Sequence, residues 1–120
     1  MGNKIDKFED LEVWKESMRL AVNLYRLLKE CRDFSLRDQM QRAAVSIPSN
    51  IAEGYERKSN KEFIHYLYIS KGSCSELRTQ LYLAIKTGIV DGNCGEECLE
   101  TTRRISAMLF NLIKSRKDNF

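Results

Sequence analysis

Apolar residues recur at alternating intervals of three and four along most of the chain, and this period limits the folds available to it most strongly. Such spacing gathers apolar side chains on one face of an α-helix, whereas a half-buried strand requires strict alternation. In the first such segment, about residues 11 to 32, a heptad seam is formed by Leu11, Trp14, Met18, Ala21, Tyr25 and Leu28. The pattern predicts an all-α protein.

Three further segments carry the same period, at about residues 36 to 54, 60 to 87 and 94 to 116. The third helix has its seam at Phe63, Leu67, Ser70, Cys74, Leu77, Leu81 and Ala84. Residue pairs typical of helix N-termini precede the last three segments: Ser35 with Asp38, Ser59 with Glu62, and Asn93 with Glu96. Short connections make each helix antiparallel to the preceding one. We therefore expect a single domain, residues 1–120, folded as an up-down-up-down four-helix bundle.

The composition fits a globular domain and no membrane span. Hydrophobic residues make up 42% of the chain and charged residues 31%. No apolar run is long enough to cross a bilayer, and Asp6, Glu9 and Asp10 stand where a signal peptide needs apolar residues. We expect a cytoplasmic protein without membrane partners, whose four cysteines are reduced thiols.

The only proline, Pro48, lies in the middle of "AAVSIPSNIAEGY". Because Ile47 and Ile51 on either side keep helical phase, we expect one kinked helix through Pro48 rather than a loop. Proline in an unsupported helix costs roughly 3 kcal/mol, so its freed carbonyls need polar partners. A polar stripe around the kink consists of Arg42, Ser46, Pro48, Ser49, Asn50 and Glu53. It is either an ordinary solvated face or a contact surface toward another subunit or a ligand.

The third helix carries a second row of residues about a third of a turn from its seam. This candidate subunit interface consists of Ile64, Tyr68, Gly72, Ser75, Thr79 and Tyr82. A monomeric bundle would show solvated charge on that side, although scattered surface aromatics are also common. The alignment of the row favours a homo-oligomer.

Basic residues cluster on the second and third helices and at their junction. The candidate nucleic-acid contacts are Arg37, Arg42, Arg57, Lys58, Lys61, Lys71 and Arg78. The chain has 20 basic and 17 acidic residues, so these side chains either contact phosphates or pair with the acids. An oligomer would multiply weak phosphate contacts. No groove-reading helix or interleaving of aromatic and basic residues is recognisable, so we expect binding without sequence specificity.

Metal binding and catalysis are poorly supported. Cys94 and Cys98 are four residues apart, and Cys31 ends the first helix near the start of the fourth, so three thiols could converge. The spacing is not C-x-x-C and no histidine is near in sequence, so we predict no metal site. No catalytic dyad, triad or phosphate-binding loop is recognisable. We expect neither an enzyme nor a cofactor.

The stretch from Arg37 to Ala84 resembles the four-helix-bundle family encoded by intervening sequences in bacterial 23S ribosomal RNA genes. The family motif "RRAAxSIPSNIAEG" reads "QRAAVSIPSNIAEG" here, and "DLEVWKESMRLAVNLY" and "MLFNLIKS" are similar to the family's outer helices. The resemblance implies a protomer that assembles into a ring, most often a pentamer, without established enzymatic activity. The accessory proteins of diversity-generating retroelements, which bind nucleic acid together with a reverse transcriptase, are distantly similar.

We therefore expect a non-enzymatic homo-oligomeric scaffold associated with RNA or DNA. Its partners would be further copies of itself, nucleic acid, and a protein such as a reverse transcriptase. The alternative is a purely protein-binding or structural oligomer with no nucleic-acid role.

Overall fold

The computed structural model describes residues 4–120, and this part of the chain is all-α, with four long helices and no strand. A short 3-10 helix, η1 (Phe8–Asp10), precedes α1 (Glu12–Leu27), α2 (Phe34–Tyr55), α3 (Asn60–Lys86) and α4 (Gly92–Asn119). The predicted all-α class with four helices is confirmed. None of the described helices is long and apolar enough to span a bilayer.

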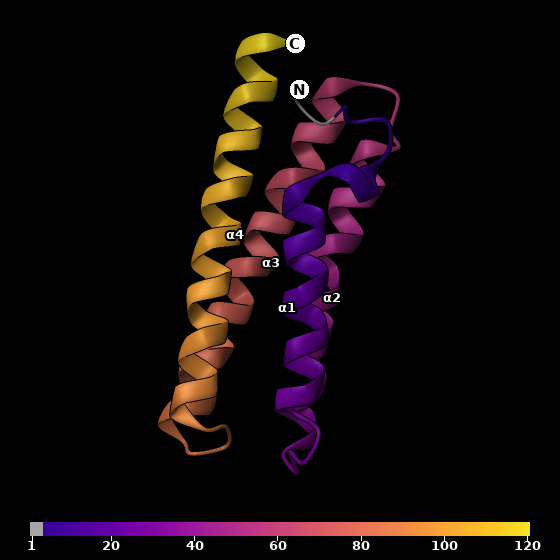
Figure 1. Cartoon of the computed structure of the whole chain (residues 1–120). Helices are drawn as coiled ribbons and strands as arrows, with labels where there is room; N and C mark the ends of the chain where they lie inside the picture. Colours follow the sequence, from indigo (N-terminus) through magenta and orange to yellow (C-terminus); the bar gives the residue numbers. More distant parts are fainter. Residues whose placement is uncertain (1–3) are drawn as a thin grey trace.

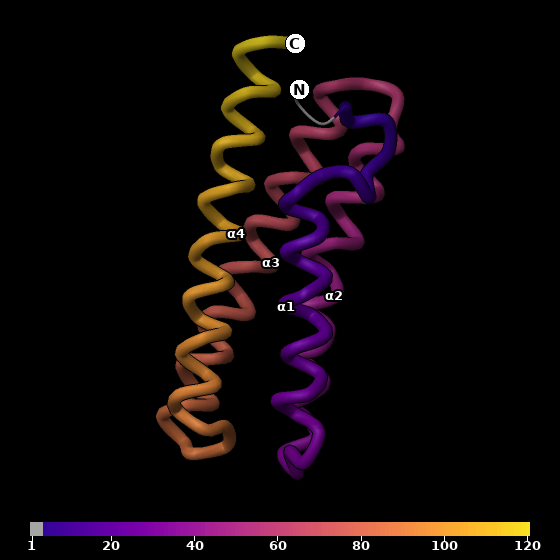
Figure 2. Tube along the Cα trace, in the orientation of Figure 1, coloured from indigo at the N-terminus to yellow at the C-terminus, as the bar shows by residue number. Residues whose placement is uncertain are grey.

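The four helices lie side by side along their lengths. Following the colours in Figure 1, the chain descends along α1, rises along α2, descends along α3 and rises along α4. Each helix packs against the next one in sequence, and α1 also packs against α4. The Cα trace in Figure 2 places the turns that connect the four helices at the two ends of the bundle, while the segment before α1 lies beside α2.

Every helix contributes to one apolar core. Fully buried side chains include Leu24 of α1, Ile47 of α2, Leu77 of α3 and Leu109 of α4. The buried residues of α3 are the seven predicted from its seam, so the period assigned to this helix is confirmed.

The heptad seam predicted for α1 is partly wrong. The buried residues are Val13, Ser17, Leu20, Ala21 and Leu24, whereas Met18 and Tyr25 of the predicted seam are exposed. The apolar residues of α1 span a wider arc than one seam, and because α1 packs against α4, the part of this arc that includes Leu20 and Leu24 is buried instead of the part with Met18 and Tyr25. The helix also ends at Leu27 instead of residue 32, because the following residues turn toward α2.

The predicted cap of α2 is wrong. The helix begins at Phe34, and the Asp33 carboxylate accepts a hydrogen bond from the Leu36 amide at 3.0 Å. This carboxylate, two residues before Ser35, satisfies a free amide and interacts favourably with the positive end of the helix dipole. Ser35 therefore lies inside the first turn.

Helix α4 is also capped by an aspartate upstream of the predicted residue, whereas α3 is capped by the residue that the sequence predicts. Instead of Asn93, Asp91 caps α4 by accepting from the Cys94 amide at 3.1 Å. In α3 the prediction is confirmed, since the Ser59 hydroxyl accepts from the Glu62 amide at 3.2 Å. An aspartate just upstream displaces the predicted cap in both helices where the prediction failed.

The prediction that the helix continues through Pro48 is confirmed, and the kink stays a prediction. Pro48 lies inside α2, and the residues from Ser46 to Asn50 are helical without a break. Ile47, Pro48 and Ile51 are all buried. The proline ring therefore belongs to the core.

Candidate functional site

The polar stripe of α2 divides between the inside and the outside of the bundle. The Ser46 hydroxyl lies 2.8 Å from the Ser73 hydroxyl of α3, and the Asn50 amide donates to the Ser46 carbonyl at 2.8 Å and to its hydroxyl at 2.9 Å. Arg42 and Ser49 are exposed. Glu53 is also exposed and pairs with Arg57 at 3.2 Å. The stripe is therefore not one contact surface, because Ser46 is bonded to α3 and Pro48 is buried.

The polar groups near Pro48 join α2 to α3. The Ser70 hydroxyl donates to the Ile47 carbonyl at 2.9 Å in a buried position. One turn past Ile51, an ideal Cβ on Gly54 would lie 2.5 Å from Tyr66 Cβ and 3.1 Å from Phe63 Cδ1. The two helices thus approach at a distance that only glycine accommodates. The buried residues around Pro48 therefore pack α2 against α3. The exposed residues of the stripe, Arg42, Ser49 and Glu53, do not form one surface with them.

The seven candidate nucleic-acid contacts do not share one face. Arg37 pairs with Asp38 at 3.0 Å and Arg57 pairs with Glu53. Lys58 and Lys61 are exposed at the junction of α2 and α3. Arg42 borders the outer grooves of α2.

Lys71 and Arg78 are the members that the fold brings together. They border a groove of about 380 Å³ between α3 and α4, together with Arg103, Ser106, Ala107, Phe110 and Asn111. Small side chains form part of its lining, and cations stand on both sides. The groove is therefore suited to an extended anion more than to a compact one.

Exposed aromatic rings flank these cations. The Tyr82 hydroxyl accepts from Arg103 at 2.6 Å, and the Tyr68 hydroxyl accepts from Lys117 at 2.7 Å, with the Lys117 ammonium 5.1 Å from the Tyr68 ring centroid. Phe110 is 58% exposed. We call this surface the α3–α4 face and define it by Tyr68, Lys71, Arg78, Tyr82, Arg103, Phe110 and Lys117.

The α3–α4 face carries uncompensated positive charge. Within the described residues, Lys71, Arg78 and Lys117 have no carboxylate within 4.0 Å. Arg103 is paired with Glu100, and the hydrogen bonds to Tyr82 and Glu100 raise its pKa above the usual value. The face therefore stays cationic across the physiological pH range. The sequence assigned Tyr68 and Tyr82 to one candidate surface and Lys71 and Arg78 to another, and it gave no sign that Phe110 and Lys117 of α4 lie beside them.

The candidate subunit interface on α3 overlaps this face. Ile64 is half-buried against the core, while Gly72, Ser75 and Thr79 are exposed, and the two tyrosines of the row bind cations of α4. An added Cβ on Gly72 would meet nothing within 4 Å. Self-association through this row stays a prediction.

A second exposed apolar surface was not predicted. Met18, Val22 and Tyr25 of α1 and Val45 of α2 are 39–46% exposed. Shallow grooves border them, one lined by Tyr25 and Val45 and the other by Met18 and Val22. We call these four residues the α1–α2 face. The sequence pattern had placed Met18 and Tyr25 in the core.

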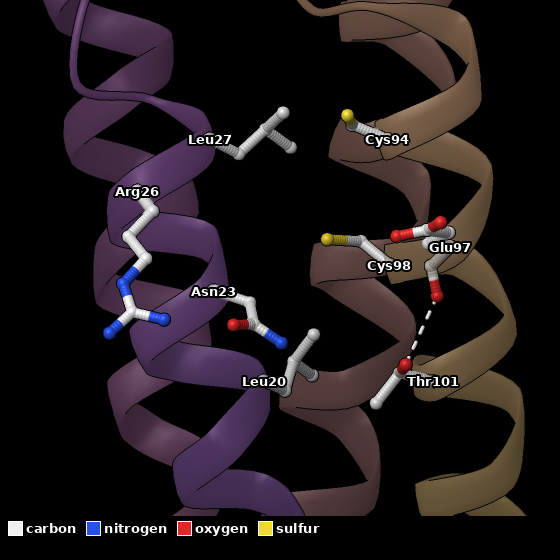
Figure 3. A pocket seen from close by; sticks show the side chains of 8 residues that line it. All are labelled: Leu20, Asn23, Arg26, Leu27, Cys94, Glu97, Cys98 and Thr101. Carbon is white, nitrogen blue, oxygen red and sulfur yellow. Dashed lines mark hydrogen bonds between the residues drawn. The ribbon is translucent and has the colours of Figure 1, made fainter.

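Two cysteines face a cavity of about 420 Å³ between α1 and α4. Figure 3 shows Cys94 and Cys98 pointing toward α1, opposite Leu20, Asn23 and Leu27, while the Thr101 hydroxyl donates to the Glu97 carbonyl at 3.0 Å. Cys31 does not line the cavity.

The environment of these thiols disfavours thiolates. A hydrogen bond with Asp91 raises the pKa of Cys94, and burial raises that of Cys98. Among residues 4–120, no three histidine, cysteine or carboxylate side chains are grouped to hold a metal ion. The prediction that Cys94 and Cys98 bind no zinc is left to metal analysis.

The fold and these surfaces define a class of protein: an all-α chain of four long helices, with an exposed apolar face and an exposed basic, aromatic face. Residues 9–111 match the family model described as the 23S rRNA-intervening sequence protein, and the chain belongs to this family. The resemblance stated from the sequence is thereby confirmed.

A solved structure supports the same assignment. The chain is similar to a protein with unknown function from the S23 ribosomal protein family of Bacteroides thetaiotaomicron VPI-5482, whose crystal structure was determined at 1.70 Å resolution. The TM-score is 0.80 at 27% sequence identity, and the alignment covers 85% of this chain and 98% of that chain. No curated protein matches the chain.

Proposed function

We propose that this protein is a non-enzymatic homo-oligomeric scaffold that binds RNA or DNA without sequence specificity. The observation that carries the proposal is the group of three unpaired cations, Lys71, Arg78 and Lys117, on the α3–α4 face. Each cation that meets a phosphate releases counterions, which makes binding favourable at low salt and steeply salt-dependent.

The proposed assembly is a ring of up-down-up-down protomers, with the pentamer implied by the family resemblance. A ring needs two different surfaces of each protomer, because its interfaces are head-to-tail. We assign one of them to the α1–α2 face, whose exposed side chains include Met18, Val22 and Val45, which have no polar group to satisfy. The rival contact is the α3 row, where Tyr68 and Tyr82 are already bonded to cations.

Light scattering distinguishes the two contacts. If the α1–α2 face forms the interface, Val22→Lys lowers the mass toward the 14.0 kDa protomer, while Thr79→Lys on α3 leaves it unchanged. The reverse result assigns the interface to the α3 row, and a lowered mass for both variants assigns the two surfaces of the ring to the α1–α2 face and the α3 row. A mass of 14.0 kDa for the unmodified protein at micromolar concentration refutes self-association.

The nucleic-acid part is tested by titrating labelled RNA and DNA over a range of salt concentrations. Replacing both Lys71 and Arg78 by glutamine should weaken binding to all sequences alike and reduce the salt slope by about 2. A double replacement of Lys29 and Arg32 by glutamine is the matched control, because both are exposed near the turn between α1 and α2 and neither is a candidate contact. No binding at low salt discards this role and leaves a scaffold that contacts only proteins, which the apolar α1–α2 face would favour.

A further inference from the structure

We infer that the α3–α4 face binds a single strand of nucleic acid, with its bases stacked on Tyr68, Phe110 and Tyr82 and its phosphates on the neighbouring cations. This inference rests on the proposed function and narrows its ligand. Neither a basic patch alone nor an aromatic patch alone would lead to it.

The rings and cations alternate along the two helices. On α3, Tyr68 and Tyr82 enclose Lys71 and Arg78, and the groove beside these two cations contains Phe110 of α4. Fourteen residues separate the tyrosines, which is about 21 Å at 1.5 Å per residue. A strand whose bases turn onto the rings is more extended than the stacked rise of about 3.4 Å per nucleotide, so the face accommodates fewer than about six nucleotides.

Two of the three rings are held by hydrogen bonds, and all three remain accessible. The hydrogen bonds from Arg103 and Lys117 hold Tyr82 and Tyr68 by their hydroxyl groups, and yet the two side chains are 41% and 49% exposed. Phe110 has no polar atom to bond and is 58% exposed. A ring held at its edge loses little freedom on binding, which favours stacking.

Lys117, Lys71 and Arg78 retain hydrogen-bond donors that can contact phosphates. Lys117 donates one of its three ammonium hydrogens to Tyr68. Lys71 and Arg78 are half-buried, line the groove and have no carboxylate within 4.0 Å among the described residues. The cations therefore supply contacts along the strand, while the rings supply the surfaces that any base can use.

The shape of the face disfavours a duplex. The bases of a duplex are stacked on one another, so three exposed rings would gain nothing from it. Two adjacent helices, each about 10–12 Å wide, are also too broad for a major groove of about 12 Å. The combination of a broad helix pair with accessible rings fits a strand whose bases are free to turn outward.

The test measures fluorescence anisotropy with a labelled twelve-nucleotide thymidine strand and with a duplex of the same length, at the same low salt. We expect tighter binding of the single strand. Phe110→Ala should weaken it about 5- to 150-fold, the range found for loss of one stacked base. Phe34→Ala is the matched control, because Phe34 is 59% exposed on another part of the bundle; it should leave affinity unchanged.

A second variant protects the test against a folding defect. Tyr82→Leu removes a ring at the other end of the face and should weaken the single strand in the same direction. Circular dichroism and light scattering must show an unaltered fold and mass for the variants that are compared.

The outcomes separate the inference from the proposed function. If the unmodified protein binds the duplex as tightly as the single strand, or if neither ring substitution matters while the glutamine variants of Lys71 and Arg78 weaken binding, stacking is refuted and phosphate binding stands. If neither probe binds at low salt, both the inference and the proposed nucleic-acid role fail.

Discussion

Gly54 and Gly72 both lie inside long helices, but a methyl group added at each position meets different surroundings. At Gly54 the new Cβ would lie 2.5 Å from Tyr66 Cβ and 3.3 Å from the Phe63 carbonyl oxygen. At Gly72 nothing lies within 4 Å. Comparing Gly54→Ala with Gly72→Ala therefore separates two contributions to the free energy of unfolding: the steric cost where α2 and α3 approach closely, and the intrinsic preference of a helix for alanine.

The expected free energies of unfolding differ in sign. Alanine is favoured over glycine in a helix by up to about 1 kcal/mol, so Gly72→Ala should stabilise the protein by about 0.5–1 kcal/mol. Gly54→Ala gains the same amount but incurs an overpacking cost of about 1–3 kcal/mol. That cost should lie at the upper end, because Tyr66 Cβ is fixed to the α3 backbone and cannot rotate away. The net loss is then about 1–2 kcal/mol.

Urea unfolding followed by circular dichroism at 222 nm measures both changes at one protomer concentration, since self-association would shift the apparent stability. Gly95→Ala is an informative intermediate, because its Cβ would meet Ile85 Cγ1 at 2.6 Å and the mobile end Cδ1 at 2.7 Å. We expect its loss to be smaller than that of Gly54→Ala. A Gly54→Ala protein as stable as Gly72→Ala would refute the packing argument.

Three further predictions concern α2, the buried thiol and the α1–α4 ion pair. Pro48→Ala regains a backbone hydrogen bond but loses a buried ring, so the two effects on the free energy of unfolding should largely cancel. The mass in light scattering should change, and an unchanged mass excludes a role of Pro48 in assembly. Burial raises the pKa of Cys74 to about 11, so the thiol should resist alkylation until the protein unfolds, and rapid labelling of the native protein would contradict this. Because the unfolded chain loses the Cys74 proton at a lower pH than the folded chain, the contribution of this thiol to stability should be lost as the pH rises from about 9 toward 11. Arg104, 2.8 Å from Glu16, lowers the pKa of that carboxyl. Its contribution is therefore present above the usual glutamate pKa and lost as the pH falls through the lowered one, so Arg104→Ala should cost about 0.5 kcal/mol at pH 7 and nothing at pH 2, as measured by unfolding at both pH values.

The period of three and four was sufficient for α3 and insufficient for α1. Helix α3 has an unbroken row from Phe63 to Ala84, whereas its second row is interrupted by Gly72, Ser75 and Thr79, so the buried face could be identified directly. Helix α1 has two overlapping rows, one through Leu20 and Leu24 and another through Met18 and Tyr25. Only the position of α4 decides which row is buried, and a single helix contains no information about its neighbour's position.

The same limit explains the candidate site. Lys71, Arg78, Tyr68 and Tyr82 were each identified from the sequence, but as members of two separate surfaces. All four lie on one face of α3, and the structure adds Phe110 and the basic residues of α4 beside them. Interleaving across two helices depends on their axial register, which here follows from tertiary contacts such as the hydrogen bond from Cys74 to the Thr102 carbonyl at 3.0 Å.

The motif that carries the family resemblance is largely used by the protomer itself. Ser46 is hydrogen-bonded to Ser73, and the Ile47 carbonyl accepts a hydrogen bond from Ser70. Because Gly54 has no side chain, α3 can pack closely against it at Tyr66. A stretch with these roles specifies how α2 lies on α3 and needs no ligand to account for its composition. Family membership therefore accounts for the shape of the protomer, while a partner must bind where side chains are exposed and unpaired. Met18, Val22 and Val45 of the α1–α2 face and Lys71 and Arg78 of the α3–α4 face meet that condition. Self-association through the α1–α2 face leaves the α3–α4 face open to a strand, whereas a ring that used the α3 row as its second surface would compete with the strand.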